Sequence, residues 1–222
     1  MKKENTNSDL MNRKLYLSSL AGSELKEYLK SCGYELCLLY ENGRVSKAIS
    51  THPDIFMCAL KDGIYFGDSS LLEASYPGDV LYNAAAVGKY LVCNRYTSQD
   101  LIRSSGLTPV YVNQGYVKCN LVVLDDTHVI TEDEGIAKTL GQLTDIDCLL
   151  IKPRQVRLEG YDCGFIGGAS GRIEDTIVFN GDLSAHSDYE IICRFISKCN
   201  LQIKYFDTYP LTDIGSIISV KS

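Results

Sequence analysis

Two short runs of the sequence contain the residue types that nucleophilic and acid–base chemistry requires. The run HPD at 52–54 precedes the apolar segment IFMCAL, and the run GYVKC at 115–119 ends in Cys119. His52 could transfer a proton near neutral pH, and the carboxylate of Asp54 could accept two hydrogen bonds from a guanidinium. A lysine directly before Cys119 would lower the pKa of the thiol and favour a thiolate nucleophile. The alternatives are structural: a loop histidine before a proline turn, an aspartate that caps the start of a strand, and a core thiol.

The glycine run GGASG at 167–171 is a third segment with a possible chemical use. Its glycines would let the backbone approach a ligand closely, and exposed amides there could hold a carboxylate or oxyanion; a strand bulge or turn is the alternative. The run has neither the Walker spacing nor the dinucleotide-binding spacing. Amide side chains at 113 and 114 could bind a ligand carboxylate or close a turn, and a histidine at 186 lies just before a helix that needs capping residues. The positions predicted to bind substrate are Asp54, Asn83, Asn113, Gln114, Gly167, Gly168, Ser170, His186 and Asp213.

The composition is that of an ordinary globular protein. The chain has 222 residues, of which 45% are hydrophobic and 23% charged, and this length can bury a substantial core. A net charge of −6 with scattered lysines and arginines argues against a nucleic-acid surface. No apolar run approaches the roughly 18 residues of a membrane span, and no apolar segment follows the first lysines as in a signal peptide. We therefore expect a cytoplasmic protein that binds small molecules or proteins, and neither nucleic acid nor membrane.

The nine cysteines do not form a recognisable framework. Their number is odd, no CxxC pair occurs, and several lie inside apolar segments. Buried free thiols behave as small hydrophobic side chains, and the reducing cytosol keeps them unpaired. The sequence therefore predicts neither a disulfide framework nor a metal site.

One pattern of strands and helices recurs along the chain and must position these residues. Three ββαβ units are visible at 82–113, 119–152 and 163–207, and two strands joined around Asp62-Gly63 form a partial unit before them. The segment GSIISV near the C-terminus could pair with KLYLSS at 14–19, whose following helix and strand complete a unit split between the two ends. A ring of about five units hides its sheet edges. We predict a five-bladed α/β propeller in a single domain over 14–222, preceded by a disordered tail at 1–13.

This architecture resembles the guanidino-group-modifying enzyme superfamily, or penteins, which includes arginine and agmatine deiminases, dimethylarginine hydrolases and amidinotransferases. The segments VNQGYVKCNLVVLDD, GFIGGASGRI and PLTDIGSI also resemble an uncharacterised clostridial-type family assigned to that fold. The resemblance implies that the first strand of each unit borders a central channel, where its polar residues converge. HPD at 52–54 is similar to the His-x-Asp signature of deiminases, and GYVKC at 115–119 is similar to the Gly-x-x-His-Cys run around their nucleophile, with lysine in place of histidine. The enzymes have that cysteine in the C-terminal unit, whereas the run TDIGSIIS here has none.

Two functions are compatible with these observations. The first is a hydrolase or deiminase that acts on a small guanidine- or amidine-containing molecule in the central channel. Cys119 would form a covalent amidino adduct, His52 would transfer protons, and Asp54 and Asp213 would bind the cationic group, without a metal or organic cofactor. The second is a binding or assembly protein that keeps the propeller and has lost the nucleophile. Contact between Cys119 and an imidazole would favour the enzyme; the sequence assigns neither the substrate nor the oligomeric state.

Overall fold

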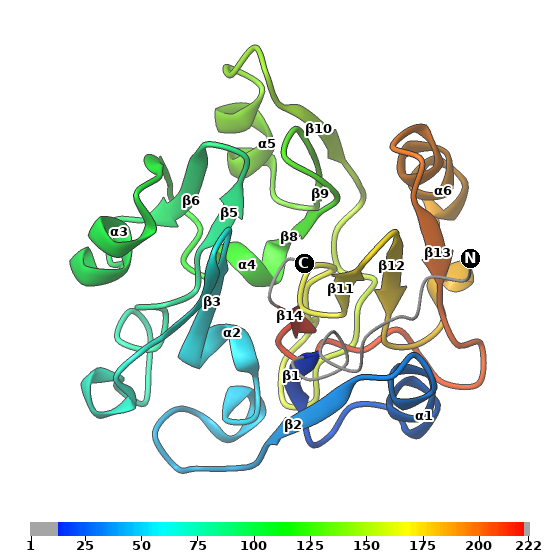
Figure 1. Cartoon of the computed structure of the whole chain (residues 1–222), viewed down its shortest axis with the longest axis horizontal. Helices are drawn as coiled ribbons and strands as arrows, with labels where there is room; N and C mark the ends of the chain where they lie inside the picture. Colours follow the sequence, from blue (N-terminus) through cyan, green and yellow to red (C-terminus); the bar gives the residue numbers. More distant parts are fainter. Residues whose placement is uncertain (1–12, 220–222) are drawn as a thin grey trace, which may run out of the picture.

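The strands of the protein are divided among five small sheets (Figure 1). The structure is a computed structural model that describes residues 13–219. Four of the sheets have three strands, and in each of these an antiparallel pair is followed by a parallel pair whose strands are joined by a helix. The fifth is the two-stranded hairpin β3–β4.

Three of the sheets are continuous in sequence. The first contains β5 (Ala85–Val87), β6 (Tyr90–Asn94), α3 (Gln99–Ser105) and β7 (Thr108–Val112). The second follows the short helix α4 (Val117–Asn120) and contains β8 (Leu121–Val123), β9 (His128–Thr131), α5 (Glu134–Leu140) and β10 (Asp147–Leu150). The third contains β11 (Ser170–Ile173), β12 (Thr176–Phe179), α6 (Tyr189–Lys198) and β13 (Gln202–Lys204).

The two ends of the described chain share one sheet. Strand β14 (Ile218–Ser219) pairs antiparallel with β1 (Lys14–Ser18), which pairs in parallel with β2 (Glu35–Leu39) after helix α1 (Ser23–Ser31). The remaining sheet follows α2 (Pro53–Phe56) and contains only β3 (Met57–Leu60) and β4 (Gly63–Phe66). Short 3₁₀ turns occur at Lys47–Ile49, Ser69–Leu71 and Leu183–Ala185.

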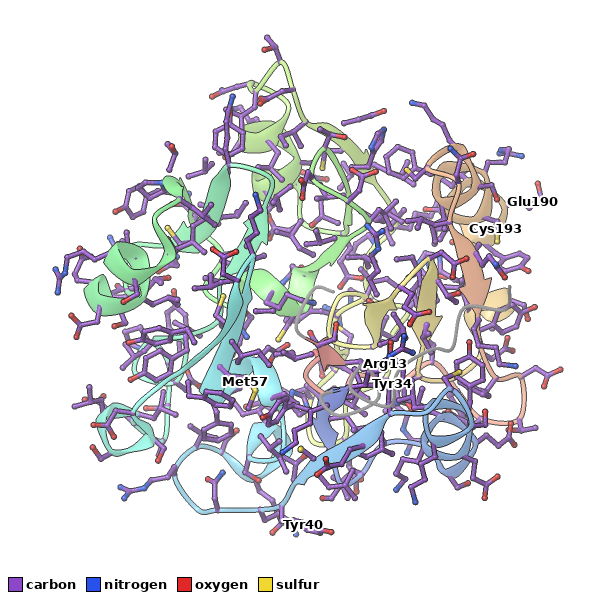
Figure 2. The ribbon with its side chains drawn as sticks, viewed as in Figure 1. Arg13, Tyr34, Tyr40, Met57, Glu190 and Cys193 are labelled. Carbon is purple, nitrogen blue, oxygen red and sulfur yellow. The ribbon has the colours of Figure 1, made fainter. Side chains whose placement is uncertain are left out.

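One strand of each sheet lies near the centre of the molecule, and the longer helices lie at its periphery (Figure 1). These inner strands are β3, β5, β8, β11 and β14, and each contacts the next in that order, with β14 contacting β3 again. The peripheral helices are amphipathic: α6 buries Ile192 and Ile196, four residues apart on one face. Figure 2 shows the same division for single side chains, with Met57 in the interior and Tyr40 and Glu190 at the edge. The arrangement therefore brings the start of every inner strand close to the axis.

Three further expectations from the sequence bear on the fold. The disordered tail predicted at 1–13 lies outside the described residues, except for Arg13, whose guanidinium forms an ion pair of 2.8 Å with Glu174. All nine cysteines are free. Within residues 13–219, no helix is long and apolar enough to cross a membrane.

Candidate functional site

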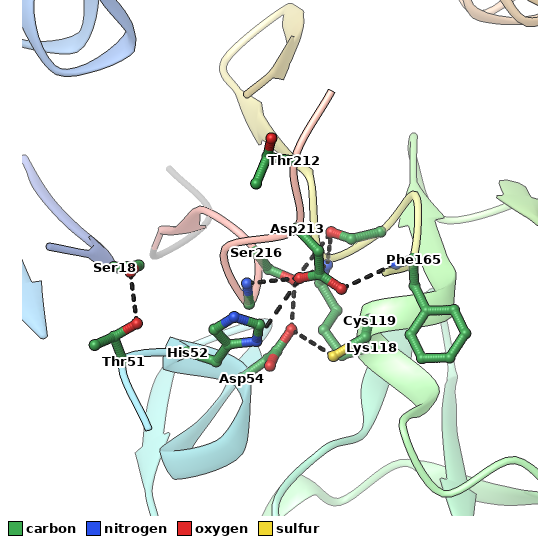
Figure 3. A network of polar contacts seen from close by, with 12 residues as sticks. Ser18, Thr51, His52, Asp54, Lys118, Cys119, Phe165, Thr212, Asp213 and Ser216 are labelled. Carbon is green, nitrogen blue, oxygen red and sulfur yellow. Dashed lines mark hydrogen bonds and ion pairs between the residues drawn. The ribbon is translucent and has the colours of Figure 1, made fainter. Parts of the chain in front are cut away.

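Polar residues from four separate segments meet near the points where the inner strands β3, β5, β8 and β14 begin. We call them the central cluster; Figure 3 shows the contacts of all its members except Asn83. Each segment lies just before an inner strand, so the repeated fold, and not local sequence, brings the residues together. The cluster consists of His52, Asp54, Asn83, Lys118, Cys119, Asp213 and Ser216.

The thiol of Cys119 contacts a carboxylate and an amide. Its Sγ donates to Oδ2 of Asp54 at 3.1 Å and accepts from Nδ2 of Asn83 at 3.3 Å. The same asparagine accepts a hydrogen bond of 2.7 Å from the backbone N–H of Lys118, and this bond fixes the helical turn that carries the thiol. Within the described part of the chain, no hydrogen bond joins Cys119 to an imidazole. The cysteine is thus neither an inert thiol among aliphatic side chains nor part of a Cys–His pair.

The electrostatic environment favours the neutral thiol. Burial raises the pKa of Cys119 well above its usual value, and the negative charges of Asp54 and Asp213 raise it further. The sequence predicted the opposite direction, because a lysine precedes the cysteine. That prediction is wrong, because burial and the two carboxylates outweigh the charge of Lys118, whose ammonium donates to Ser216 Oγ at 3.0 Å and to the carbonyl of Leu121 at 3.3 Å. Burial also lowers the pKa of this lysine.

Asp54 is the centre of the cluster. It is fully buried, and its Oδ2 accepts from Ser216 Oγ at 2.7 Å as well as from the thiol. Oδ1 has no hydrogen-bond partner among the described residues. Burial raises the pKa of Asp54, an effect that His52 opposes. An unpaired oxygen on a buried carboxylate carries a free-energy cost that a bound cation would remove.

His52 and Asp213 lie side by side on the other flank. The imidazole Nδ1 is 3.7 Å from Oδ1 of Asp213, and His52 is only 2% exposed. Burial lowers the pKa of His52, which therefore stays neutral near pH 7. The carboxylate of Asp213 accepts backbone hydrogen bonds of 2.9 Å from Phe165 and from Gly215. Burial raises the pKa of Asp213 to about 6.

The predicted glycine run serves close packing of the protein against itself. A Cβ on Gly167 would lie 2.5 Å from the carbonyl oxygens of Leu121 and Lys118, and a Cβ on Gly168 would overlap the carboxylate of Asp213. The N–H of Gly168 donates to the carbonyl of Cys119 at 2.7 Å. These glycines therefore hold the turn that carries the thiol against the segment before β11. They are not exposed amides, as the sequence suggested.

The structure does not bring every predicted residue into the cluster. Asn113 is exposed, and Gln114 bonds to Asp133 Oδ2 at 3.2 Å. His186 is buried between the turn at Leu183–Ala185 and α6, where its Nδ1 accepts from the N–H of Asp188 at 3.0 Å. Gln114 and His186 thus make turn and cap contacts. Ser170 donates to the carbonyl of Gly167 at 3.3 Å and so lies beside the cluster.

Two buried carboxylates near the cluster were missed in the sequence. Glu132 is 6% exposed, its Oε2 has no hydrogen-bond partner in the described chain, and burial and then Asp213 raise its pKa to about 8. Asp79 accepts from the hydroxyl of Tyr116 at 2.7 Å, and its Oδ1 also has no partner there. Burial raises the pKa of Asp79. The sequence signal that could have identified Glu132 is an acidic residue at the end of an apolar strand, in HVITE at 128–132.

A cavity of about 600 Å³ lies along the inner strands. All five inner strands line it, through residues that include Leu60, Ala85, Val122, Arg172 and Ile218. Lys118 is the one member of the central cluster that also lines this cavity; His52, Asp54 and Cys119 do not. We call it the axial cavity. The lysine therefore separates the acidic part of the cluster from the cavity.

Comparisons with known proteins identify the fold. A family model described as "Family of unknown function (DUF6873)" matches residues 64–218, and no curated protein matches the sequence. A Cys-to-Ser mutant of dimethylarginine dimethylaminohydrolase from Pseudomonas aeruginosa, complexed with citrulline, is similar with a TM-score of 0.55 and 10% identity over 88% of this chain and 92% of that one. An adduct of dimethylarginine dimethylaminohydrolase with 4-chloro-2-hydroxymethylpyridine gives 0.54 and 11% over 89% and 93%. At these identities the similarity concerns the fold, and the predicted relation to the pentein fold is confirmed.

Proposed function

We propose that this chain, which belongs to the family of unknown function DUF6873, is a hydrolase or deiminase that acts on a small guanidine- or amidine-containing molecule through Cys119. One observation carries the proposal: the thiol of Cys119 lies 3.1 Å from the buried carboxylate of Asp54. That pair combines a nucleophile with a group that can take its proton and bind a cation. The fold is compatible, because similar structures of dimethylarginine dimethylaminohydrolase contain citrulline or an adduct with a small molecule.

We also propose that the chain has the propeller architecture predicted from the sequence. The five sheets form a five-bladed α/β propeller in one domain over 14–222, with one blade split between the termini. The pairing of β14 with β1 and the cyclic contacts of the five inner strands support this arrangement. The substrate reaches the central cluster along the channel of the propeller, in a cytoplasmic protein that requires no cofactor.

The charge of the substrate is essential to the proposed chemistry. A guanidinium or amidinium in the cluster would bind Asp54 Oδ1 and Glu132 Oε2, two of the buried carboxylate oxygens that have no hydrogen-bond partner in the described chain. Its positive charge would offset the carboxylates that raise the pKa of Cys119. The thiol is therefore activated only when a cation is bound. This dependence protects the free enzyme from reacting with unrelated electrophiles.

The proposed reaction has two stages, formation of the covalent adduct and its hydrolysis. The thiol proton moves to Asp54 as Sγ attacks the amidine carbon, which forms a C–S bond. The leaving amine takes this proton from Asp54 and departs as its C–N bond breaks. Water then gives a proton to the neutral imidazole of His52 and attacks the adduct, the C–S bond breaks, and the proton passes from His52 to Sγ, which restores the thiol. His52 suits this role because its lowered pKa keeps it unprotonated at pH 7.

A second function is favoured by one specific observation. The thiol of Cys119 is neutral and hydrogen-bonded to a carboxylate, with no imidazole bonded to it in residues 13–219. A protein that binds a cationic small molecule without transforming it would need the carboxylates of the cluster and not the nucleophile. In that case the propeller serves as a binding or assembly module.

Turnover of a small set of compounds separates the two functions. The purified chain is incubated with arginine, agmatine, citrulline and S-methyl-L-thiocitrulline, and ammonia, amine or thiol release is measured. The enzyme predicts release from at least one compound, loss of release in Cys119→Ser, and unchanged release in Cys93→Ser, whose thiol is also buried but lies in a different hydrophobic cluster. Full activity of Cys119→Ser would refute the role of Cys119 as the nucleophile. Thermal stabilisation by a compound without any turnover would establish the binding protein instead.

A further inference from the structure

Three residues with metal-binding side chains meet at the surface, apart from the central cluster. Asp125 and His128 belong to the hairpin between β8 and β9, and Cys199 is the residue after α6. One ligand atom from each lies within 4.8 Å of the other two. All three are partly buried. The fold therefore brings an oxygen, a nitrogen and a sulfur donor from distant segments to one point.

The hairpin holds its two donors in a fixed arrangement. Oδ1 of Asp125 accepts backbone hydrogen bonds from Thr127 at 2.7 Å and from His128 at 2.8 Å, which orients the carboxylate. Oδ2 lies 3.0 Å from Nδ1 of His128. Two ligands on a tetrahedral zinc ion, each about 2.0–2.2 Å from the metal, are roughly 3.3 Å apart. The oxygen and nitrogen are thus already close to the separation that a shared metal requires.

A second carboxylate supports the histidine from its other side. Asp147 is the partner of His128 in the parallel pairing of β10 with β9, and its Oδ2 is 4.0 Å from Nε2 of the imidazole. Lys198 holds this carboxylate through an ion pair of 2.8 Å, and the ring of Phe195 packs edge-on against the imidazole. Metal-binding histidines commonly direct their second nitrogen to a carboxylate in this way. This contact is independent of the three donors.

We propose that Asp125, His128 and Cys199 form a binding site for a zinc-like divalent cation. The donor set of one oxygen, one nitrogen and one sulfur suits zinc, and a fourth position remains for water or another ligand. Binding breaks the S–H bond of Cys199, the thiolate coordinates the metal, and the proton leaves to solvent. A zinc–sulfur bond is about 2.3 Å long, and its formation would replace the hydrogen bond of 3.4 Å that Sγ of Cys199 donates to the carbonyl of Phe195.

The proposed metal site borders the axial cavity. Asp125 and its neighbour Thr127 both line that cavity. A metal bound to the carboxylate would therefore lie at the rim of the cavity, and its fourth position could be taken by a ligand there.

Cobalt titration of the full chain tests the site. Protein treated with a chelator is titrated with Co²⁺ and then with Zn²⁺. We expect one equivalent of Co²⁺ to produce a thiolate-to-metal charge-transfer band that Zn²⁺ abolishes. Cys199→Ser and His128→Gln should each weaken binding by more than about 100-fold, and Asp147→Asn by about 10–100-fold. Cys193→Ser replaces a partly buried cysteine of α6 that is not one of the three donors. It serves as the matched control and should bind cobalt as tightly as the unmodified protein does.

A second measurement needs no substitution and so does not depend on the folding of a variant. Iodoacetamide labelling of the unmodified chain, followed by mass spectrometry of its peptides, should show protection of Cys199 by Zn²⁺ and no protection of Cys193. The proposal fails if Co²⁺ produces no thiolate band, if Cys199→Ser binds cobalt as tightly as the unmodified chain, or if zinc leaves the labelling of Cys199 unchanged.

Discussion

Replacement of Gly167 by alanine tests how the site is held together. Gly167 lies just before β11, against the turn of α4 that carries Cys119. A Cβ at this position would lie 2.5 Å from the carbonyl oxygens of Leu121 and Lys118 and 2.7 Å from that of Cys119. All three contacts are with backbone atoms, which cannot rotate away as a flexible side chain could. The turn and the segment before β11 must therefore separate.

The size of the effect follows from these contacts. Forcing one extra carbon into a packed interior costs about 1–3 kcal/mol. Separation would also weaken the hydrogen bond of 2.7 Å from the N–H of Gly168 to the carbonyl of Cys119, and loss of a buried bond costs about 1–3 kcal/mol. We expect Gly167→Ala to lower the free energy of unfolding by about 3–5 kcal/mol. For a chain of this size the melting temperature should fall by roughly 10 °C.

Thermal and urea unfolding followed by circular dichroism measure this change. The control is Gly141→Ala at the end of α5, where the backbone is helical at φ −64° and the nearest atom to the new Cβ is the carbonyl oxygen of Ala137 at 3.1 Å. A compatible glycine-to-alanine change alters stability by at most about 1 kcal/mol. If Gly167→Ala unfolds within 1 °C of the unmodified protein and of this control, the close backbone contact that we describe is incorrect.

Three further substitutions test the buried polar groups. Burial raises the pKa of Glu132 from 4.5 to about 8. The contribution of this group to stability is therefore full below pH 4.5 and is lost as pH rises through 8, a loss of at most about 5 kcal/mol in the free energy of unfolding. Glu132→Gln should not show this loss when urea unfolding is compared at pH 5 and pH 9. Tyr116→Phe leaves the buried carboxylate of Asp79 without its bond of 2.7 Å and should cost about 1–3 kcal/mol, whereas Tyr90→Phe, which loses an exposed bond, should change little in the same assay. Asn180→Ala removes an amide that accepts one backbone hydrogen bond at 3.0 Å and donates another at 2.9 Å, and the unfolding free energy of the protein should fall by about 2–4 kcal/mol. A loss below about 0.5 kcal/mol for Tyr116→Phe or Asn180→Ala would contradict the corresponding contact, and an unchanged difference between pH 5 and pH 9 in Glu132→Gln would contradict the buried acid.

The sequence predicted much of the secondary structure because local patterns determine it. The ββαβ units follow from alternating apolar strands and from helices such as α6, whose isoleucines recur at four-residue spacing. The pairing of β14 with β1 could be anticipated because the two ends of the chain complete one unit. The relation to penteins followed from the repeat and from short motifs. Apart from the pairing of the two ends, each of these signals lies within about 50 residues of sequence.

The chemical detail of the site could not be predicted in the same way. The direction of the Lys118 side chain depends on Ser216, nearly 100 residues away, so adjacency in sequence misled the prediction for the pKa of Cys119. Glu132 becomes a perturbed acid only because folding buries it near Asp213. Sequence alone shows neither which side chains share a buried volume nor which hydrogen bonds satisfy them.

Sequence alone also selects residues that do not belong to the site. Gln114 and His186 have the residue types of a binding site, yet each makes hydrogen bonds within its own turn or with a nearby helix. The carboxylate of Asp125 and the thiol of Cys199, by contrast, approach each other from distant segments and carry no motif. Residue type gives a list of candidates, and the fold selects among them.

The most direct test of the proposed function is covalent labelling of Cys119 by an electrophile that binds in the cluster. The purified chain is incubated with 4-chloro-2-hydroxymethylpyridine, which forms an adduct with the structurally similar dimethylarginine dimethylaminohydrolase. Intact-mass and peptide mass spectrometry then locate any adduct. We predict one adduct per chain, on Cys119, formed with loss of chloride and absent from both Cys119→Ser and Asp54→Asn. An unmodified Cys119, or labelling spread evenly over the partly buried cysteines, would contradict the proposal that this thiol is a nucleophile.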